Sequence, residues 1–339
     1  MPDQTVLPRW RGFNLLELFS RVGPEDRRSG EFREDDFRWI ADLGFDFIRI
    51  PMDYQLWADP GDPYKVKEPV LEQIDRVIRL GERYGQHISL NIHAAPGYCI
   101  NPKPEPFGSL WRDPEALRAF SFYWGLFARR YRGIPAARLS FNLLNEPRVR
   151  PEEGTRDDYI RVVEAAVAAI REGDPDRLVI SDGLDVGRTP IPELVKLGIA
   201  QACRAYDPQR SLTHYRAGWG QQPTEPVPVP EWPQPASHPG GAWDHARLEA
   251  HYQPWFDLAK QGVGVHCGEG GCYKYTPHPV VLAWLNDVLD VLTSHGVGYA
   301  LWNFRGPFGI LDSEREDVQY EDFHGHQLDR KLLDLLQRY

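Results

Sequence analysis

The fold is decided by two segments, FDFIRI at residues 45–50 and HISLNIH at residues 87–93, and by the helical pattern between them. Both segments are short and β-rich, as buried strands are. The stretch that joins them repeats apolar residues every three or four positions, at Val70, Leu71, Ile74, Val77 and Ile78. This spacing places them on one face of a helix. A strand, a helix and a second strand in this order predict a parallel sheet with its helices outside.

The same alternation recurs along the whole chain. Short β-rich runs lie at 10–14, 45–50, 87–93, 139–142, 178–181, 199–206, 263–267 and 299–304, and helix-like stretches separate them. Eight such units favour a closed barrel over an open sheet, so we predict an α/β fold of the (β/α)8, or TIM-barrel, class. No linker interrupts the pattern, which predicts one catalytic domain over residues 1–339. The fifth helix, around 191–196, is short and has the weakest signal.

One segment, from about 215 to 243, departs from the rhythm because it is rich in proline and tryptophan. Its composition is compatible with disorder or with a linker between domains. We favour a long folded loop after the sixth strand, since Trp219, Trp232 and Trp243 give it side chains that can pack. Such a loop lies on the face where barrel enzymes carry their sites.

Composition and charge exclude several classes of protein. The chain has 339 residues and a net charge of −10, and its basic residues are scattered, so we expect no nucleic-acid partner. No stretch approaches the roughly 18 apolar residues of a membrane span, and no leader-like segment opens the sequence, so we expect a soluble cytoplasmic protein without a membrane partner. The four cysteines are expected to be free thiols.

Polar residues gather where the predicted strands end. In a barrel these ends meet at one rim, although the residues are far apart in sequence. They are Arg49, His93, Asn145, Glu146, Tyr206, Glu269 and Trp302. Two carboxylates that face each other across such a rim suit the cleavage of an acetal, because one attacks the anomeric carbon while the other protonates the departing oxygen.

The repulsion between these two carboxylates predicts that their pKa values differ. Retaining glycosidases hold the two groups about 5–5.5 Å apart. At that separation, with an effective dielectric constant of about 20, two negative charges repel by about 3 kcal/mol, which raises the pKa of whichever carboxyl ionises last by roughly 2. One carboxyl can therefore stay protonated near neutral pH, as a general acid requires.

Several motifs, taken together and in order, resemble glycoside hydrolase family 5, the cellulase and mannanase family. They are WRGFN at 10–14, GFDFIRIP at 44–51, LNIHAAPG at 90–97, NEP at 145–147, YDP at 206–208, THY at 213–215, the glutamate after the seventh strand and LWNF at 301–304. The resemblance spans residues 10–302, nearly the whole chain. It implies that Glu146 is the acid/base and Glu269 the nucleophile of a retaining enzyme that needs no metal or other cofactor.

The resemblance also implies supporting roles for the other residues at the rim. Arg49 would hold and orient the nucleophile, and Tyr206 would donate a hydrogen bond to it. Asn145 would bind the 2-hydroxyl of the sugar at the cleavage point. His93 would line the same subsite, and Trp302 would form the platform under that sugar.

Two departures from the family pattern are visible. Arg204 occupies a position, two residues before the tyrosine of the sixth strand, where family members commonly have histidine. Either this cation contacts the site directly or His214 takes over part of the task. The segment CGEGGCYKY around Glu269 is also unusual, so the assignment of Glu269 depends on its place after the seventh strand. Trp219, beside THY, is a further candidate for binding sugar.

The leading functional prediction is hydrolysis of a β-linked, glucose-type oligo- or polysaccharide, with cellulase-like β-1,4-glucan cleavage as the family's usual reaction. The expected location favours short substrates or exo-action. A β-mannoside hydrolase of the same mechanism is the nearest alternative, because one or two contacts near the 2-hydroxyl separate the two sugars. A non-catalytic carbohydrate-binding barrel and a metal-dependent hydrolase are alternatives of other classes.

Overall fold

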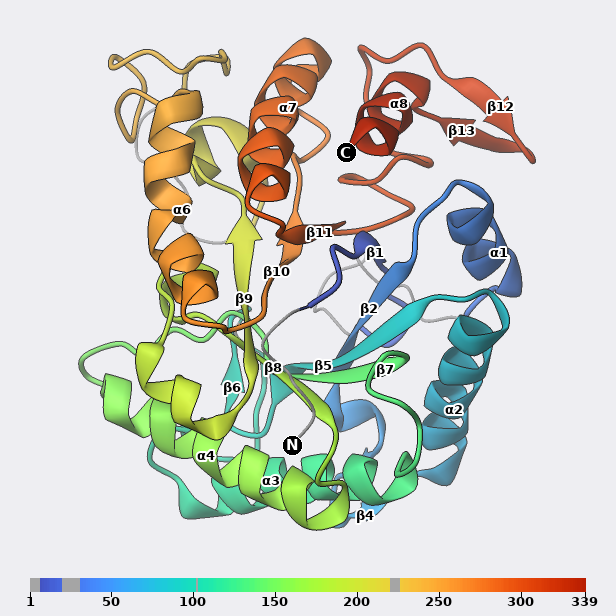
Figure 1. Cartoon of the computed structure of the whole chain (residues 1–339), viewed down its shortest axis with the longest axis vertical. Coiled ribbons are helices and arrows are strands. Elements are labelled where there is room, and N and C mark those ends of the chain that lie inside the picture. The colour runs from blue at the N-terminus through green and yellow to red at the C-terminus, as the bar shows by residue number, and fades with distance from the viewer. Residues whose placement is uncertain (1–6, 20–30, 102, 220–225) are drawn as a thin grey trace.

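The computed structural model describes residues 7–19, 31–101, 103–219 and 226–339. Eight parallel strands form a closed barrel, because β2 pairs both with β1 and with β5. The helices lie around it (Figure 1). Each predicted run overlaps one barrel strand. These strands are β1 (Arg11–Asn14), β2 (Phe47–Asp53), β5 (His87–Ala95), β7 (Leu139–Leu144), β8 (Leu178–Asp182), β9 (Ala200–Ala205), β10 (Val265–Gly270) and β11 (Gly298–Leu301).

Helices follow seven of the eight barrel strands. They are α1 (Glu34–Asp42), α2 (Glu68–Arg83), α3 (Pro114–Arg130), α4 (Arg156–Gly173), α6 (His245–Lys260), α7 (His278–Ser294) and α8 (Arg330–Arg338). After β8 the chain forms only the short segment α5 (Leu184–Gly187) and the 3-10 turn η2 (Pro192–Leu197). The predicted fifth helix, around 191–196, is therefore only the short 3-10 turn η2.

The loops of the barrel contain several short turns and strands. Tyr54–Leu56 forms the 3-10 turn η1, and Gln209–Thr213 forms the π-type turn η3. The paired short strands are β3 (Ala58–Asp59) with β4 (Asp62–Val66), and β12 (Glu321–Phe323) with β13 (His326–Leu328). A further strand, β6 (Tyr98–Cys99), turns back antiparallel on the end of β5.

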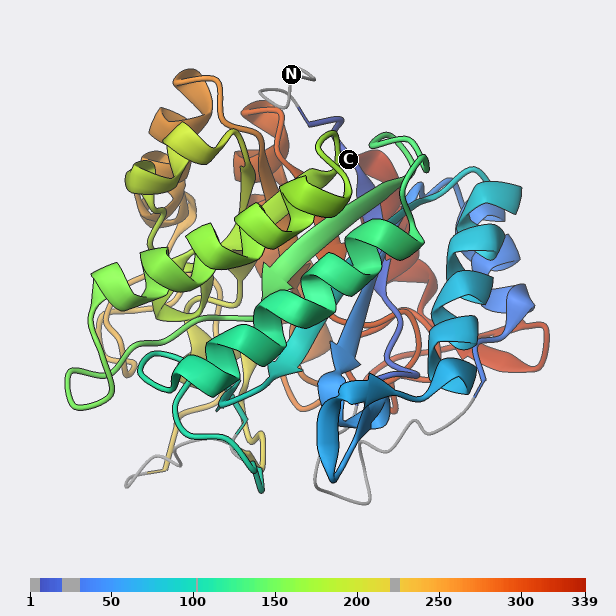
Figure 2. The ribbon, with the colours of Figure 1, turned by 90° about the horizontal axis from the view of Figure 1, so that it is seen from below.

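The apolar stripes predicted from sequence face the barrel. On α2, Leu71, Ile74 and Val77 are all 1% exposed or less, and burial of each such side chain stabilises the fold by about 1.5–3 kcal/mol. Figure 2 shows α3 and α4, in green and yellow-green, side by side across the outside of the strands. α4 begins with a capping box in which Thr155 and Asp158 satisfy each other's backbone N–H groups.

The interior of the barrel is closed at the amino ends of the strands. Trp10, Phe47 and neighbouring apolar residues form a separate cluster there, and the Trp10 ring stacks on His87 at 3.8 Å between centroids. Burial lowers the pKa of His87 to about 3, so this imidazole is neutral and packs as a core group. Because one end is filled in this way, polar chemistry is confined to the carboxyl ends.

The proline- and tryptophan-rich segment packs against the barrel helices where it is described, from 226 onward. Trp243 is buried and pairs with Gln234 through two backbone hydrogen bonds. The indole of Trp232 donates to Asp287 Oδ2 on α7 at 2.9 Å. This part of the segment is a folded loop, as predicted, while residues 220–225 lie outside the described ranges.

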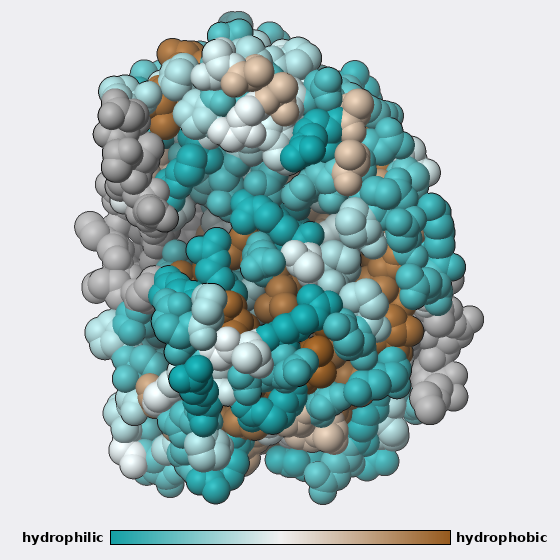
Figure 3. Space-filling view, turned by 90° about the vertical axis from the view of Figure 1, so that its left-hand side faces the viewer, coloured by the Kyte–Doolittle hydropathy of each residue, from teal (hydrophilic) through white to brown (hydrophobic). Residues whose placement is uncertain are grey.

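The surface on the α6 side of the molecule is largely hydrophilic. Figure 3 shows hydrophobic side chains there only in scattered patches. Within the described ranges, no helix combines the length and the apolar character needed to cross a membrane.

Candidate active site

Arg49 is hydrogen-bonded to four residues of the polar cluster at the carboxyl ends of the strands. It is 1% exposed, and its guanidinium donates to Glu269 Oε1 at 2.5 Å and to Asn145 Oδ1 at 2.8 Å. Its remaining hydrogen bonds reach Asn142 Oδ1 at 2.8 Å and Asn14 Oδ1 at 3.0 Å. A planar fork held by four acceptors has one orientation. Arg49 therefore fixes the position of the Glu269 carboxylate and places positive charge against it.

Glu269 reaches the barrel interior through a local irregularity of β10. The register between β10 and β9 shifts between Cys267 and Glu269, as a β-bulge does. Both carboxylate oxygens of Glu269 are occupied, one by Arg49 and the other by the Tyr206 hydroxyl at 3.2 Å. The flanking glycine Gly270 lets β9 approach closely, since a Cβ there would lie 2.8 Å from that of Ala205. The unusual segment CGEGG thus serves close strand packing.

Arg204 contacts both candidate carboxylates. Its Nε lies 3.6 Å from Glu146 Oε1, and its Nη2 lies 3.4 Å from Glu269 Oε1. The same Nη2 donates to Asn145 Oδ1 at 3.0 Å and makes a short hydrogen bond to Asp182. Burial alone would lower the pKa of Arg204, but the surrounding carboxylates outweigh it and raise the pKa. Arg204 is therefore a permanent cation between the two glutamates.

His214 does not share these contacts. Its ring lies edge-on to that of Tyr206, with 4.9 Å between centroids, and its Nδ1 faces the Thr213 hydroxyl at 3.0 Å. Burial, followed by the charges of Arg210 and Arg188, lowers the pKa of His214 to about 3. Of the two alternatives left open by the sequence, the structure places Arg204 at the carboxylates and His214 behind Tyr206.

Glu146 has a different environment from Glu269. It directly follows β7, has a positive φ of 46°, and its backbone N–H donates to Asp182 Oδ2 at 2.9 Å. Its side chain is 14% exposed. Burial, and next the negative charge of Glu269, raise the pKa of Glu146 to about 8. This carboxyl is consequently protonated at neutral pH, with burial as the first cause and the repulsion considered from the sequence as the second.

Aromatic side chains line the region around the carboxylates. His93 Nε2 lies 3.2 Å from the amide nitrogen of Asn145, and the partly exposed ring of Trp302 is 5.5 Å from the His93 ring. Trp219 is 4.6 Å from Tyr273 and edge-on to it, and it packs with Trp302 against one cluster that includes Tyr206. Of the residues predicted for the site, Arg49, Arg204 and Tyr206 contact the carboxylates directly, and Asn145 and His214 contact those residues in turn. His93 lies beyond Asn145, Trp302 beyond His93, and Trp219 beyond His214.

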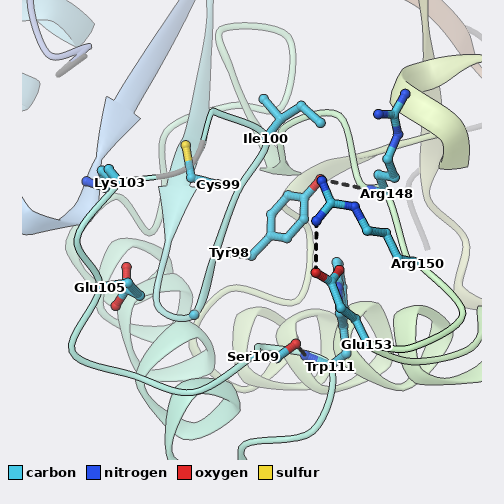
Figure 4. Close-up of a pocket in the computed structure, with 11 residues that line it drawn as sticks. Tyr98, Cys99, Ile100, Lys103, Glu105, Ser109, Trp111, Arg148, Arg150 and Glu153 are labelled. Atoms are coloured by element: carbon cyan, nitrogen blue, oxygen red, sulfur yellow. Dashed lines mark hydrogen bonds and ion pairs between the residues drawn. The ribbon is translucent and has the colours of Figure 1, made fainter. Parts of the chain in front are cut away.

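A cavity of about 250 Å³ adjoins the Glu146 side of the site. The Tyr98 hydroxyl donates to the Glu146 carbonyl oxygen at 2.7 Å and accepts from the Arg148 backbone at 2.8 Å. Figure 4 shows this ring between the loops that follow β5 and β7, with Arg150 paired to Glu153 at the opening.

Sequence reasoning missed three buried residues of the cluster, Asn14, Asn142 and Asp182. Asn14 and Asp182 are the last residues of β1 and β8, and Asn142 lies within β7. Asn14 and Asn142 hold Arg49, and Asp182 holds Arg204. The rule that polar residues at strand ends point to a site would have found Asn14 and Asp182, had the fifth run been read one residue further.

The cysteines near Glu269 are free thiols. Cys267 is buried, and its Sγ donates to the Glu269 backbone oxygen at 3.3 Å. Cys272 is buried as well, and its carbonyl oxygen accepts from Arg315 at 2.5 Å. Across the described parts of the chain, no three His, Cys, Asp or Glu side chains are grouped so that they could hold a metal ion.

Comparisons with known proteins agree on one family. Residues 10–306 match the family model described as cellulase, glycosyl hydrolase family 5. Endoglucanase C of Acetivibrio thermocellus is 25% identical over 319 residues, which cover 85% of this chain and 88% of that protein. A crystal structure described as a glycoside hydrolase is 39% identical, with a TM-score of 0.90 over 97% of this chain and 99% of that one.

A more distant structural neighbour shares the fold. Thermotoga maritima Cel5A, solved in complex with cellobiose, is 21% identical with a TM-score of 0.77, over 99% of this chain and 100% of that one. The same enzyme has been solved with mannotriose. Since the family model spans most of the sequence and the barrel carries the expected polar rim, the chain belongs to glycoside hydrolase family 5 and is a glycoside hydrolase.

Proposed function

We propose that the enzyme hydrolyses β-linked, glucose-type saccharides by a retaining double displacement, with Glu269 as nucleophile and Glu146 as acid/base. The observation that carries this proposal is the shared cation. Arg204 lies 3.6 Å from Glu146 and 3.4 Å from Glu269. Two carboxylates that contact one guanidinium face each other across a narrow gap, which fits attack by one of them better than an intervening water.

The two glutamates are prepared for different tasks. Arg49 and Tyr206 each bind one oxygen of Glu269, so its carboxylate is oriented before the sugar arrives. Glu146 is protonated at neutral pH and can donate to the departing glycosidic oxygen. Formation of the glycosyl-enzyme ester removes the charge of Glu269, which lowers the pKa of Glu146. Glu146 then accepts a proton from the water that releases the sugar.

The neighbouring residues are proposed to bind the sugar at the cleavage point. Asn145 Oδ1 already accepts from Arg49 and Arg204, so its amide nitrogen is the group that can donate to a 2-hydroxyl. Trp302 is partly exposed beside His93, and an indole face suits the apolar face of a pyranose. Trp219, beside His214 and Tyr273, is proposed to contact a second sugar.

The substrate class is proposed from the relatives. The similar curated protein is an endoglucanase, which favours β-1,4-linked glucose. A β-mannoside is the second candidate, because the structural neighbour Cel5A has been solved both with cellobiose and with mannotriose. Action on short oligosaccharides and a cytoplasmic location remain proposals that fit the four free thiols, since reduced cysteines are usual in that compartment.

A panel of 4-nitrophenyl β-glucoside, β-cellobioside, β-mannoside and β-mannobioside tests the proposal. We expect the cellobioside to have the highest kcat/KM. Dominance of the mannosides would transfer the assignment to the second candidate. No release from any substrate or from longer β-glucans, combined with measurable binding of cellotetraose, would replace the proposal by a carbohydrate-binding barrel.

A further inference from the structure

Asp182 is a buried carboxylate that touches both the cation and the backbone of the proposed acid/base. It is the last residue of β8 and is fully buried. Its Oδ2 accepts from the Glu146 N–H at 2.9 Å and from Arg204 Nη2. Its Oδ1 accepts from Asn142 Nδ2 at 2.8 Å. Both oxygens are therefore used, and none of these contacts involves the position of the sugar.

The charges around Glu146 balance only when Glu146 is neutral. The buried cations are Arg49 and Arg204, and the buried carboxylates in contact with them are Glu269 and Asp182. Ionisation of Glu146 would add a negative charge without a matching cation in this cluster. The groups that face or influence Glu146 are Arg49 on β2, Tyr98 after β5, Asp182 on β8, Arg188 after β8, Arg204 and Tyr206 on β9, and Glu269 on β10.

Asp182 also restrains the backbone on which the acid/base is mounted. Glu146 has a φ of 46°, a conformation that a residue with a side chain adopts only when its surroundings hold it there. The hydrogen bond from its N–H to Asp182 is one such restraint, and the Tyr98 hydroxyl on its carbonyl oxygen is another. Loss of the first would let the Glu146 side chain move relative to Glu269.

We infer that Asp182 is a positioning residue for the acid/base: it holds Arg204 and the Glu146 backbone, and its negative charge opposes ionisation of Glu146. This inference rests on the proposed function. The pKa of Glu146 agrees with this geometry, since the negative charge of Asp182 adds to burial and to the charge of Glu269 in raising that pKa. In this account Arg204 can replace a histidine at its position because Asp182 compensates for the permanent positive charge.

The test compares Asp182→Asn with Asp174→Asn. Asp174 forms the matched buried pair with Arg177, at 2.8 Å, at the end of α4 and away from the glutamates. The measurement is the pH dependence of kcat/KM on two cellobiosides. One has a 4-nitrophenyl leaving group, which benefits from protonation, and the other has a 2,4-dinitrophenyl leaving group, which leaves without it.

We expect Asp182→Asn to move the alkaline limb of the 4-nitrophenyl profile to lower pH by about one to two units, because removal of a buried charge that shares Arg204 with Glu146 shifts a pKa by roughly 1–2 at an effective dielectric constant of about 20. At pH 7.5, where a pKa of about 8 falls to about 7 or 6, this gives a loss of about three- to 25-fold on that substrate. The kcat/KM on the 2,4-dinitrophenyl cellobioside should fall less, because this leaving group departs without a proton. Asp174→Asn should lower the melting temperature and leave both profiles unchanged.

Asp182→Glu distinguishes the effect of the negative charge from the effect of its position. It is also the test variant to use if Asp182→Asn does not fold. It keeps the negative charge, so we expect an unchanged alkaline limb and a kcat lower by about tenfold or more, since the longer side chain displaces Arg204. An unshifted limb in Asp182→Asn, or a wild-type kcat in Asp182→Glu, would overturn the inference. Failure of the proposed function would be seen separately, as a wild-type enzyme that hydrolyses neither substrate.

Discussion

At the scale of single residues, the site assigns different chemistry to two identical side chains. Glu269 has a cation on one oxygen and a phenol on the other, whereas Glu146 is partly buried and feels the charge of Glu269. Environment, rather than residue type, therefore separates the proposed nucleophile from the proposed acid. The carboxylates themselves could be found from the sequence because they follow predicted strands.

Glu269→Gln should abolish turnover while the fold persists. The amide cannot form the glycosyl ester, so we expect kcat on 4-nitrophenyl cellobioside to fall by more than about a thousandfold. Arg49 keeps its three asparagine acceptors in this variant, which limits the loss of stability. Glu172→Gln, an exposed position on α4, is the control. Steady-state kinetics measure the loss of turnover, and a thermal melt checks that the fold persists. Wild-type turnover in Glu269→Gln would refute the assignment of Glu269 as nucleophile.

The pH dependence of wild-type activity should carry the signature of Glu146. Its pKa is raised to about 8, so the general-acid form persists through neutral pH, and kcat/KM should decline as pH rises through about 8. The free energy of unfolding should depend on pH in the same direction as the activity. The folded state favours the protonated carboxyl, so this contribution is present at low pH and is lost as pH rises toward 8.

Two titrations check this expectation. One follows kcat/KM from pH 5 to 10, and the other compares the melting temperatures of wild type and Glu146→Gln over the same range. Wild type should lose stability as pH rises from 5 to about 8, and the variant should lack this decrease. An alkaline limb of kcat/KM below pH 6 would contradict the protonation state proposed for Glu146.

At the scale of elements, the strand ends and their irregularities bring the site together. The bulge in β10 turns Glu269 inward, and glycines beside it allow β9 to approach. A strand of regular alternation would place Cys267 and Glu269 on the same face. Instead, Cys267 packs in the core and Glu269 meets Arg49.

Gly270→Ala tests this close packing. The added Cβ would lie 2.8 Å from the Ala205 Cβ and 3.1 Å from the Ala205 carbonyl oxygen, so β9 or β10 must shift. We expect a loss of about 1–3 kcal/mol in the free energy of unfolding, together with a lower kcat because Glu269 lies on β10 and Tyr206 directly follows β9. Gly218→Ala, whose Cβ would meet nothing within 4 Å, is the control for denaturant unfolding. Equal stability of the two variants would contradict the packing described for β9 and β10.

The elements themselves were predictable to different degrees. The eight strands could be predicted because each is a short run buried on the barrel, and the apolar stripe of α2 could be predicted from its period. The fifth helix could not be predicted reliably, since 191–196 is too short to show a period. The choice between Arg204 and His214 was also beyond the sequence, because it depends on where the turn η3 carries His214 after the strand has ended.

At the scale of the whole molecule, the barrel separates stability from chemistry. The amino ends of its strands are filled by Trp10, Phe47 and the neutral His87, and the carboxyl ends hold the buried ion pairs. Closure of the sheet brings Arg49 and Glu269 together although 220 positions separate them in sequence. Contacts of this kind follow from barrel geometry once the strand count is known, whereas the partners of Asp182 depend on the detailed register of β7, β8 and β9.

The central claim is that Glu146 and Glu269 act together in a double displacement. Proton NMR of the first sugar released from a β-cellobioside, recorded before mutarotation, tests it most directly. Two inversions at the anomeric carbon predict that the β-anomer appears first and the α-anomer grows in later. Initial release of the α-anomer would show single displacement by water and would contradict the role of Glu269 as nucleophile.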